Sequence, residues 1–228
     1  MPSATTGFVP SRHGFPFSNS YPPGTPVIEV PTPLGILPIG DASYGVCGGM
    51  VFAAVDLFLF GQPRPIEPEP LVFRYLCKRL IDSWNMPFGV LKYYDWQRRP
   101  AASKTFAGVR FADGLLRLTI VEEWPKIRRS IDAGLPAALG IVKSSSFSPM
   151  ALNKNHQVLA HGYELAGDES TVTLHVYDPN YPNDDTATIT FGLLDPDADT
   201  PILHSCEGAT VRGLFLTEYS RPVEPPLF

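Results

Sequence analysis

The residue with the clearest chemical potential is Cys47, in the segment GDASYGVCGGM. It lies where turn-forming residues give way to an apolar stretch, 48–60, that is typical of a buried helix. A thiol at a helix N-terminus meets unpaired backbone N–H groups and the positive end of the helix dipole, and both favour the reactive thiolate. Gly48 and Gly49 leave room beside the sulfur for a substrate carbonyl. The alternative interpretation is a small buried hydrophobic residue, because free cysteines often have that role.

The second candidate is His156, in the segment NHQVLAHGY. It begins a predicted strand, and a base at the end of a strand can face a helix N-terminus across a cleft. His161 lies five positions further on and therefore on the opposite face of the same strand, so both cannot enter one cleft. We prefer His156; the alternative is a hydrogen-bonded histidine of the core.

The third candidate is Asp178, in the segment VYDPNYP that closes the next predicted strand. If the two strands form a hairpin, Asp178 returns to the start of the strand of His156. There its carboxylate could accept a hydrogen bond from the imidazole and stabilise the imidazolium. The alternative is an Asx turn before Pro179, which the Asp-Pro-Asn sequence forms readily.

The flanking patterns predict helices first and antiparallel strands afterwards, which is an α+β fold. Apolar residues at helical spacing predict helices over residues 48–60, 71–84, 89–96 and 118–133. Runs rich in β-branched and aromatic residues, divided by turn residues, predict strands over 136–143, 156–165, 171–178, 186–191 and 211–219.

Residues 1–40 form a segment of different composition, rich in Pro, Gly, Ser and aromatic residues. Proline fixes φ and lacks a backbone donor, so this segment is predicted to contain no regular helix. Its aromatic residues are too apolar for a free linker. We therefore expect an N-terminal arm packed on a single domain of residues 41–228, and an arm that crosses the cleft is an open alternative.

The order of the three candidates resembles that of the papain-like cysteine peptidase superfamily, over about residues 41–191. NHQVLAHGY is similar to the histidine strand of that superfamily, and VYDPNYP is similar to the Asp version found in bacteriocin-leader peptidases. With GFVPSRHGFPFSN and YGVCGGM, these motifs also resemble an uncharacterised microbial family over nearly the whole chain. The resemblance implies a papain-like fold, in which N-terminal helices and a central helix beginning at Cys47 pack on a C-terminal antiparallel sheet.

One position departs from the superfamily pattern. The superfamily usually has Gln six positions before the cysteine, where its amide helps to hold the oxyanion of the intermediate. Here Asp41 stands at that position, and an ionised carboxylate would repel the oxyanion. Either Asp41 is protonated, or the loop runs in another register so that Ser43 or Tyr44 faces the site. Together with Asn180, these residues are the expected oxyanion-binding and supporting residues.

The composition excludes several other classes of function. The net charge is -5 and no basic run is present, so we expect no nucleic-acid partner. The spacing of Cys47, Cys77 and Cys206 fits no zinc site, and the residues 180–185 match no EF-hand, so we expect no metal and no organic cofactor. No apolar stretch is long enough to cross a membrane and no signal-peptide pattern is present, which predicts a cytoplasmic protein.

Taken together, these observations predict a thiol hydrolase of the peptidase or amidase kind, acting on a peptide or a small acyl or amide substrate. Cys47 attacks the carbonyl, His156 transfers the proton and Asp178 orients His156, through an acyl-enzyme intermediate. An acyltransferase with the same triad is one alternative. Another is a binding or structural protein of the same fold with weak or no turnover, which the missing glutamine favours. A weaker alternative is redox sensing by Cys47, with Cys77 or Cys206 as its partner in a disulfide.

Overall fold

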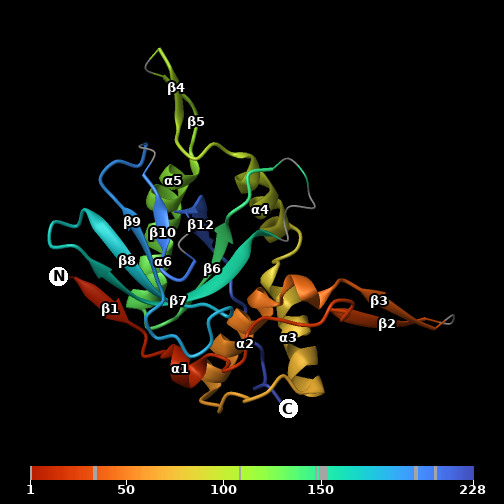
Figure 1. Cartoon of the computed structure of the whole chain (residues 1–228). Helices are drawn as coiled ribbons and strands as arrows, with labels where there is room; N and C mark the ends of the chain where they lie inside the picture. Colours follow the sequence, from red (N-terminus) through yellow and green to blue (C-terminus); the bar gives the residue numbers. More distant parts are fainter. Residues whose placement is uncertain are drawn as a thin grey trace.

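An eight-stranded antiparallel sheet forms one half of the molecule (Figure 1). The structure is a computed structural model that describes residues 2–32, 35–107, 109–146, 148, 154–197, 200–207 and 210–228. The strands lie in the order β11-β10-β9-β8-β7-β6-β12, and β1 pairs with β7. Their bounds are β1 Ser3–Thr5, β6 Ala137–Val142, β7 His156–Leu165, β8 Thr171–Tyr177, β9 Thr188–Gly192, β10 Ile202–His204, β11 Thr210–Val211 and β12 Gly213–Leu216.

The sheet curls so that its two edge strands follow each other in the chain. β11 ends at Val211 on β10, and β12 begins at Gly213 on β6, at the other end of the strand order. The prediction of one strand over 211–219 is therefore wrong, because the chain passes from one edge to the other at Arg212. The guanidinium of Arg212 donates to the backbone carbonyls of Gln97, Ser144 and Arg99, which fixes this passage.

The four predicted helices are confirmed, with ends that differ by a few residues. They are α2 Cys47–Phe60, α3 Pro70–Ser83, α4 Phe88–Arg98 and a last helix that comprises α5 Leu115–Arg117, a π-helical turn Leu118–Glu123 and α6 Trp124–Asp132. Figure 1 shows α2 and α3 side by side, next to the sheet. The helices precede most of the sheet in the chain, and the fold is mixed α+β.

The α2 helix is buried because its sequence, CGGMVFAAVDLFLF, is apolar on all sides apart from Asp56. It ends at Gly61, whose left-handed conformation (φ +63°) lets its N–H bond the carbonyls of Leu57 and Phe58. Near its start, a Cβ at Gly49 would collide with the backbone carbonyl of Leu76 in α3. Gly49 therefore allows the two helices to lie close together.

We expect Gly49→Ala to destabilise the fold, because the added methyl group would have to push α3 away. Overpacking of this kind costs about 3 kcal/mol at the upper end of its usual range. For a chain of this size that lowers the melting temperature by about 6–12 °C, measured by calorimetry. Gly167→Ala is the matched control, since a Cβ at Gly167 meets nothing within 4 Å. Equal melting temperatures for the two variants would contradict this packing.

Two clusters of buried residues make up most of the core. One lies between the sheet and the last helix and includes Trp124, Ile127 and Phe191. The other surrounds α2 and also takes in Leu159 of β7 and Tyr177 of β8. The sheet thus packs on helices through two sets of contacts, and the second set fixes α2 relative to β7 and β8.

The N-terminal segment contributes to this second cluster. Phe8 and Phe15 are fully buried there, and the ring of Phe8 lies 5.5 Å from that of Phe58 in α2. The prediction that this segment contains no regular helix is wrong, because it contains one helical turn, α1 Pro10–His13. The turn begins at Pro10. A proline is tolerated at the first position of a helix because its missing N–H would be unpaired there.

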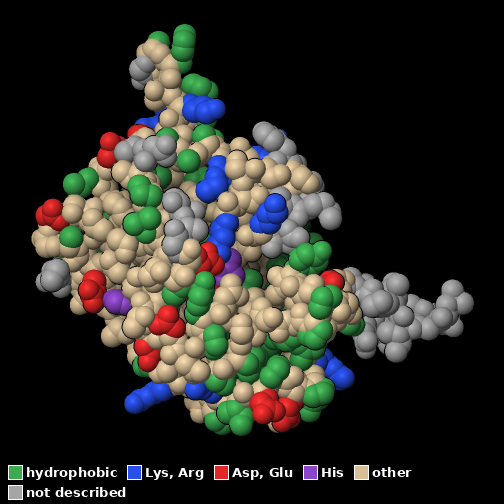
Figure 2. Space-filling view, in the orientation of Figure 1, with side chains coloured by type: hydrophobic (Ala, Val, Ile, Leu, Met, Phe, Trp, Pro, Cys, Tyr) green, Lys and Arg blue, Asp and Glu red, His purple; other side chains and the backbone are tan. Residues whose placement is uncertain are grey.

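Two hairpins that the sequence patterns did not predict project from the body (Figure 1). They are β2 Ile28–Thr32 with β3 Gly35–Ile39, and β4 Lys104–Phe106 with β5 Val109–Ala112. Figure 2 shows hydrophobic side chains on the second hairpin, where Phe106, Val109 and Phe111 are exposed. Within the part of the chain that the structure describes, no helix is both long and apolar enough to cross a membrane.

Candidate active site

Three secondary-structure elements bring Cys47, His156 and Asp178 together. Cys47 is the first residue of α2, His156 is the first residue of β7, and Asp178 directly follows β8. Because β7 and β8 are antiparallel neighbours with Leu159 opposite Tyr177, the chain returns to the start of β7 at Asp178. Nε2 of His156 lies 2.7 Å from Oδ1 of Asp178. The hairpin geometry expected from the sequence is the one observed.

The thiol of Cys47 is hydrogen-bonded to the imidazole of His156. Since Nε2 of His156 faces Asp178, Nδ1 is the ring nitrogen left to meet the thiol. Burial alone would raise the pKa of Cys47, but the charge of His156 and hydrogen bonds from His156 and from the backbone N–H groups of Gln157 and Gly48 outweigh it. The pKa of Cys47 therefore lies below that of an ordinary thiol, and the thiolate is favoured.

The pKa shifts of His156 and Asp178 are consistent with a negatively charged Cys47 beside a positively charged His156. Burial alone would lower the pKa of His156, but the charge of Cys47 and the hydrogen bond with Asp178 raise it to about 10. Burial would also raise the pKa of Asp178, but the hydrogen bond with His156 and the nearby His204 side chain hold it well below its usual range. These shifts favour a thiolate–imidazolium pair backed by a carboxylate, an arrangement that activates a nucleophilic cysteine.

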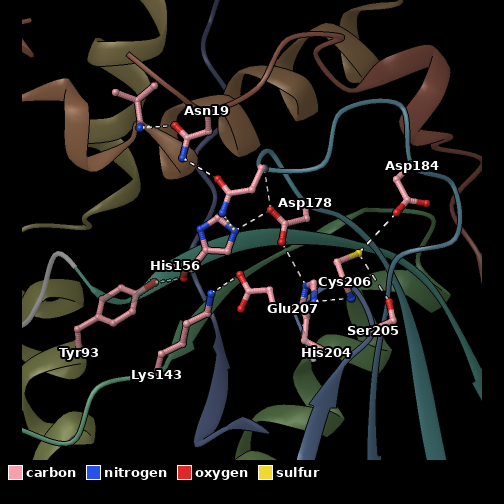
Figure 3. Close-up of polar contacts among 12 residues, drawn as sticks. Asn19, Tyr93, Lys143, His156, Asp178, Asp184, His204, Ser205, Cys206 and Glu207 are labelled. Atoms are coloured by element: carbon pink, nitrogen blue, oxygen red, sulfur yellow. Dashed lines mark hydrogen bonds and ion pairs between the residues drawn. The ribbon is translucent and has the colours of Figure 1, made fainter. Parts of the chain in front are cut away.

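Two asparagines connect the loop after β8 to the start of α2 (Figure 3). The backbone N–H of Asn180 donates to Oδ1 of Asp178 at 2.8 Å, and the Asn180 amide lies 3.5 Å from Nε2 of His156. Asn19 donates to Oδ1 of Asn180 at 3.1 Å and accepts from the N–H of Val46 at 2.6 Å. Asn19, from the N-terminal segment, therefore links Val46, which precedes Cys47, to Asn180, which lies beside His156.

Tyr93 of α4 and Gln157 of β7 complete the surroundings of the pair. The hydroxyl of Tyr93 donates to the backbone carbonyl of His156 at 3.2 Å. Burial and the nearby charge of Cys47 raise the pKa of Tyr93 well above 10, so it remains a donor. Gln157 is buried, and a Cβ at Gly48 would come within 2.8 Å of its Oε1. Gly48 thus leaves space for an amide beside the sulfur.

A cavity of about 460 Å³ opens beside Cys47. Its volume is in the range of pockets that bind small organic ligands. Cys47, His156 and Gln157 lie in its wall, together with Asn155, and most of the remaining surface is apolar. The apolar side chains are Val27, Leu80, Trp84, Met86, Val90 and the ring of Tyr93. The cavity therefore offers an apolar surface of α3 and α4 to a ligand that reaches the sulfur.

Of the predicted supporting residues near Cys47, Asp41 and Tyr44 line the cavity and Ser43 does not. Asp41 lines the cavity, and its Oδ1 accepts from the N–H of Ser43 at 2.9 Å, at the start of a short 3-10 helix, Ala42–Tyr44. That hydrogen bond lowers the pKa of Asp41, so its carboxylate is ionised at neutral pH and the protonated alternative is not supported. Tyr44 lies in the cavity wall, whereas Ser43 is exposed and is not among the lining residues.

The remaining polar candidates lie outside the cluster. The ring of His161 lies between those of Phe8 and His175, at 5.9 and 6.3 Å. Among the described residues, no group of three or more His, Cys, Asp or Glu side chains is arranged to hold a metal ion. Asp184 accepts hydrogen bonds from Thr186, in the turn before β9. All three cysteines are free thiols.

Three residues of the site were missed by the sequence patterns: Asn19, Tyr93 and His204. Each lies far along the chain from its partner, and only Asn19 falls in a segment, GFPFSN, that the motifs singled out. A scan of protein-family models finds none that matches this chain, and no curated protein and no solved structure matches it either.

Proposed function

We propose that this protein is a thiol enzyme that acts through an acyl-enzyme intermediate on Cys47. The observation that carries the proposal is the hydrogen-bonded pair of Cys47 and His156, backed by Asp178 and open to a cavity. Structural cysteines of a core lack an imidazole partner of this kind. In Cys77, for example, burial raises the pKa to about 11. Perturbed pKa values at a cavity wall are typical of functional sites.

In the proposed reaction, the thiolate of Cys47 attacks the carbonyl carbon of an amide or thioester. The bond to the leaving amine or thiol breaks, and the leaving group takes the proton of the His156 imidazolium. Water, or an acceptor amine or thiol, then attacks the acyl-enzyme while His156 removes its proton. Release of the acyl group returns the thiolate. Asp178 keeps the ring oriented and stabilises its charge in both halves of the cycle.

The α+β layout, the cysteine at a helix N-terminus and the histidine at the start of a strand also support a papain-like fold as part of this proposal. Peptidase or amidase activity comes first, and acyl transfer with the same residues is the variant in which an acceptor replaces water. The free cysteines fit a reducing compartment such as the cytoplasm. The apolar cavity wall favours a peptide or small acyl substrate with an apolar group next to its reactive carbonyl.

Acylation of Cys47 is the direct test of this function. We expect incubation with S-octanoyl N-acetylcysteamine, followed by an acid quench and intact-mass analysis, to show one octanoyl adduct that maps to Cys47. The S-acetyl analogue should react more slowly, because it leaves the apolar cavity unfilled. Burial of a few methylene groups at ~0.8 kcal/mol each is enough for a difference of tenfold or more.

His156→Ala and His175→Ala are the matched variants for this test, since His175 lies on β8 and contacts Glu164 instead of Cys47. We expect the first to abolish the adduct and the second to leave it unchanged. If wild-type Cys47 forms no adduct with either thioester while a small alkylating reagent still modifies it, the acyl-enzyme proposal is overturned.

A binding protein of the same fold is the second candidate, and Asp41 is the observation that favours it. Its ionised carboxylate lies in the cavity wall, where the developing oxyanion would be repelled. The backbone N–H groups at the start of α2 are the remaining donors for an oxyanion. In that case, thioesters would bind in the cavity and protect Cys47 from alkylation without acylating it.

A further inference from the structure

Asp178 has two carboxylate oxygens, and a different histidine faces each of them (Figure 3). Oδ1 is bonded by His156 and by the N–H of Asn180. Oδ2 lies 3.2 Å from Nε2 of His204, the last residue of β10. Both side chains of this second pair are fully buried, and neither atom has another partner among the described residues. The alignment of the two groups falls short of hydrogen-bond geometry, but within the described part of the chain this is the one polar contact that each atom makes.

The turn after β10 selects the tautomer of His204. The backbone N–H of Cys206 donates to Nδ1 of His204 at 3.3 Å. A ring nitrogen that accepts a hydrogen bond carries no hydrogen, so in the neutral ring the hydrogen is on Nε2. Nε2 is the atom that faces Asp178. The backbone therefore presents His204 to Asp178 as a donor.

Contacts on several sides fix this turn in place (Figure 3). The N–H of Ser205 donates to the carbonyl of Thr188 in β9 at 2.9 Å, and the N–H of Thr188 donates to Oγ of Ser205 at 2.9 Å. The thiol of Cys206 donates to Asp184 at 3.5 Å. A 2.6 Å ion pair joins Glu207 to Lys143, which directly follows β6. A residue held in this way keeps its direction without help from a substrate.

We propose that His204 is a positioning residue that keeps Asp178 ionised and correctly oriented for His156. This inference rests on the proposed function, since it assigns His204 to the same site. Without a donor on that side, Oδ2 would be a buried charged oxygen with no partner, which favours the protonated acid. A protonated Asp178 stabilises the imidazolium of His156 less, and the thiolate of Cys47 then becomes less stable.

Other titratable groups near Asp178 in the described part of the chain do not take the place of this donor. The side chains that interact with its charge, besides the two histidines, include Tyr177, Tyr181, Asp184 and Cys206. All four are neutral or negatively charged, so none of them stabilises the ionised form of Asp178 by its charge. His204 is therefore the group whose removal is expected to be felt at Cys47.

The test compares His204→Gln with His204→Asn through the pH dependence of iodoacetamide alkylation at Cys47. The amide nitrogen of Gln reaches the position of Nε2, whereas that of Asn reaches only the position of Nδ1. We expect His204→Gln to keep the wild-type profile. His204→Asn should move the midpoint up by about one pH unit, so that Cys47 reacts about tenfold more slowly at any pH well below the wild-type midpoint.

Asp178→Asn provides the reference that separates the two proposals. If it shifts the profile while both His204 variants behave as wild type, the role of His204 is overturned and the proposed function stands. Equal shifts in both His204 variants also overturn it, because the ring and not its donor would then matter. If Asp178→Asn leaves the profile unchanged, the proposed cluster is itself wrong.

A measurement on the unmodified protein tests the inference even if a variant fails to fold. Nitrogen-15 correlation spectra of the imidazole rings distinguish the two neutral tautomers. We expect a buried histidine, assigned to His204, with its hydrogen on Nε2 and slow exchange with water. A hydrogen on Nδ1 would overturn the proposal.

Discussion

Alkylation of Cys47 is expected to reach half its maximal rate well below pH ~8.5, the pKa of a free thiol. The expectation follows from the charge of His156 and from the N–H groups of Gln157 and Gly48, which together outweigh burial. The reactive thiolate is present at any pH above the lowered pKa, so the rate rises through that value and then stays level. Mass spectrometry after brief reaction with iodoacetamide measures the rate at each cysteine.

His156→Ala is expected to remove most of this reactivity. Burial would then act on Cys47 without the opposing imidazolium, so its pKa would rise above the ordinary value. An opposite charge at this range shifts a pKa by about 1–3 units. At a pH well below the wild-type midpoint the rate at Cys47 should therefore fall by about 10- to 1000-fold.

The other two cysteines are internal controls in the same sample. Burial raises the pKa of Cys77 to about 11, and burial also raises the pKa of Cys206. Both should react slowly at pH 6, with or without His156. If Cys47 reacts no faster than Cys206 in the wild type, or if removal of His156 has no effect, the thiolate–imidazolium pair does not exist in solution.

The sequence predicts those residues of the site whose positions follow from the ends of neighbouring helices and strands. Cys47 lies where turn residues meet an apolar helix, and Asp178 closes the strand that follows the strand of His156. A hairpin with a short connection has little freedom, so the strand ends alone place His156 and Asp178 side by side. The general α+β layout follows in the same way, from helical and alternating patterns.

The remaining part depends on contacts that local patterns do not encode. His204 reaches Asp178 only because β9 and β10 continue the sheet beyond β8. Tyr93 reaches the carbonyl of His156 across 63 positions of sequence, and Asn19 reaches Asn180 across 161. The sequence does not determine the ionisation of Asp41 for the same reason, since the pKa of this carboxyl depends on which backbone N–H groups it meets.

Arg79→Met is expected to destabilise the protein by about 3–5 kcal/mol at pH 7, the usual cost of leaving a buried charge without its partner. Arg79 and Asp56 are both buried, and Nε of Arg79 lies 2.8 Å from Oδ2 of Asp56. The same guanidinium bonds Asp82 at 2.7 Å and the carbonyl of Ser220 at 2.8 Å. It therefore joins α2, α3 and the C-terminal tail, and methionine replaces only its apolar stem. Chemical denaturation measures the loss.

The pH dependence identifies the cause of this loss. Burial raises the pKa of Asp56 even in the wild type, against the hydrogen bond of Tyr219 and the charge of Arg79. In Arg79→Met the pKa of Asp56 should rise further above its unfolded value. A carboxyl with a raised folded pKa destabilises the fold as pH rises above the unfolded pKa of ~3.9, so the variant should lose less stability at pH 4.5 than at pH 7. A loss independent of pH would point to packing instead.

A double variant without the charges of Asp56 and Arg79 tests whether this ion pair acts on stability alone or also on the reactivity of Cys47. In Asp56→Asn/Arg79→Met no buried charge is left unpaired, so we expect a large part of the stability to return, whereas additive losses would contradict the pairing. Asp56 lies nine residues along α2 from Cys47, about 14 Å at the helical rise. Below its melting temperature, Arg79→Met should therefore keep the alkylation profile of Cys47. The two ends of α2 then serve separate purposes: the charge near its C-terminus holds the helices and the tail together, and its N-terminus sets the reactivity of the thiol.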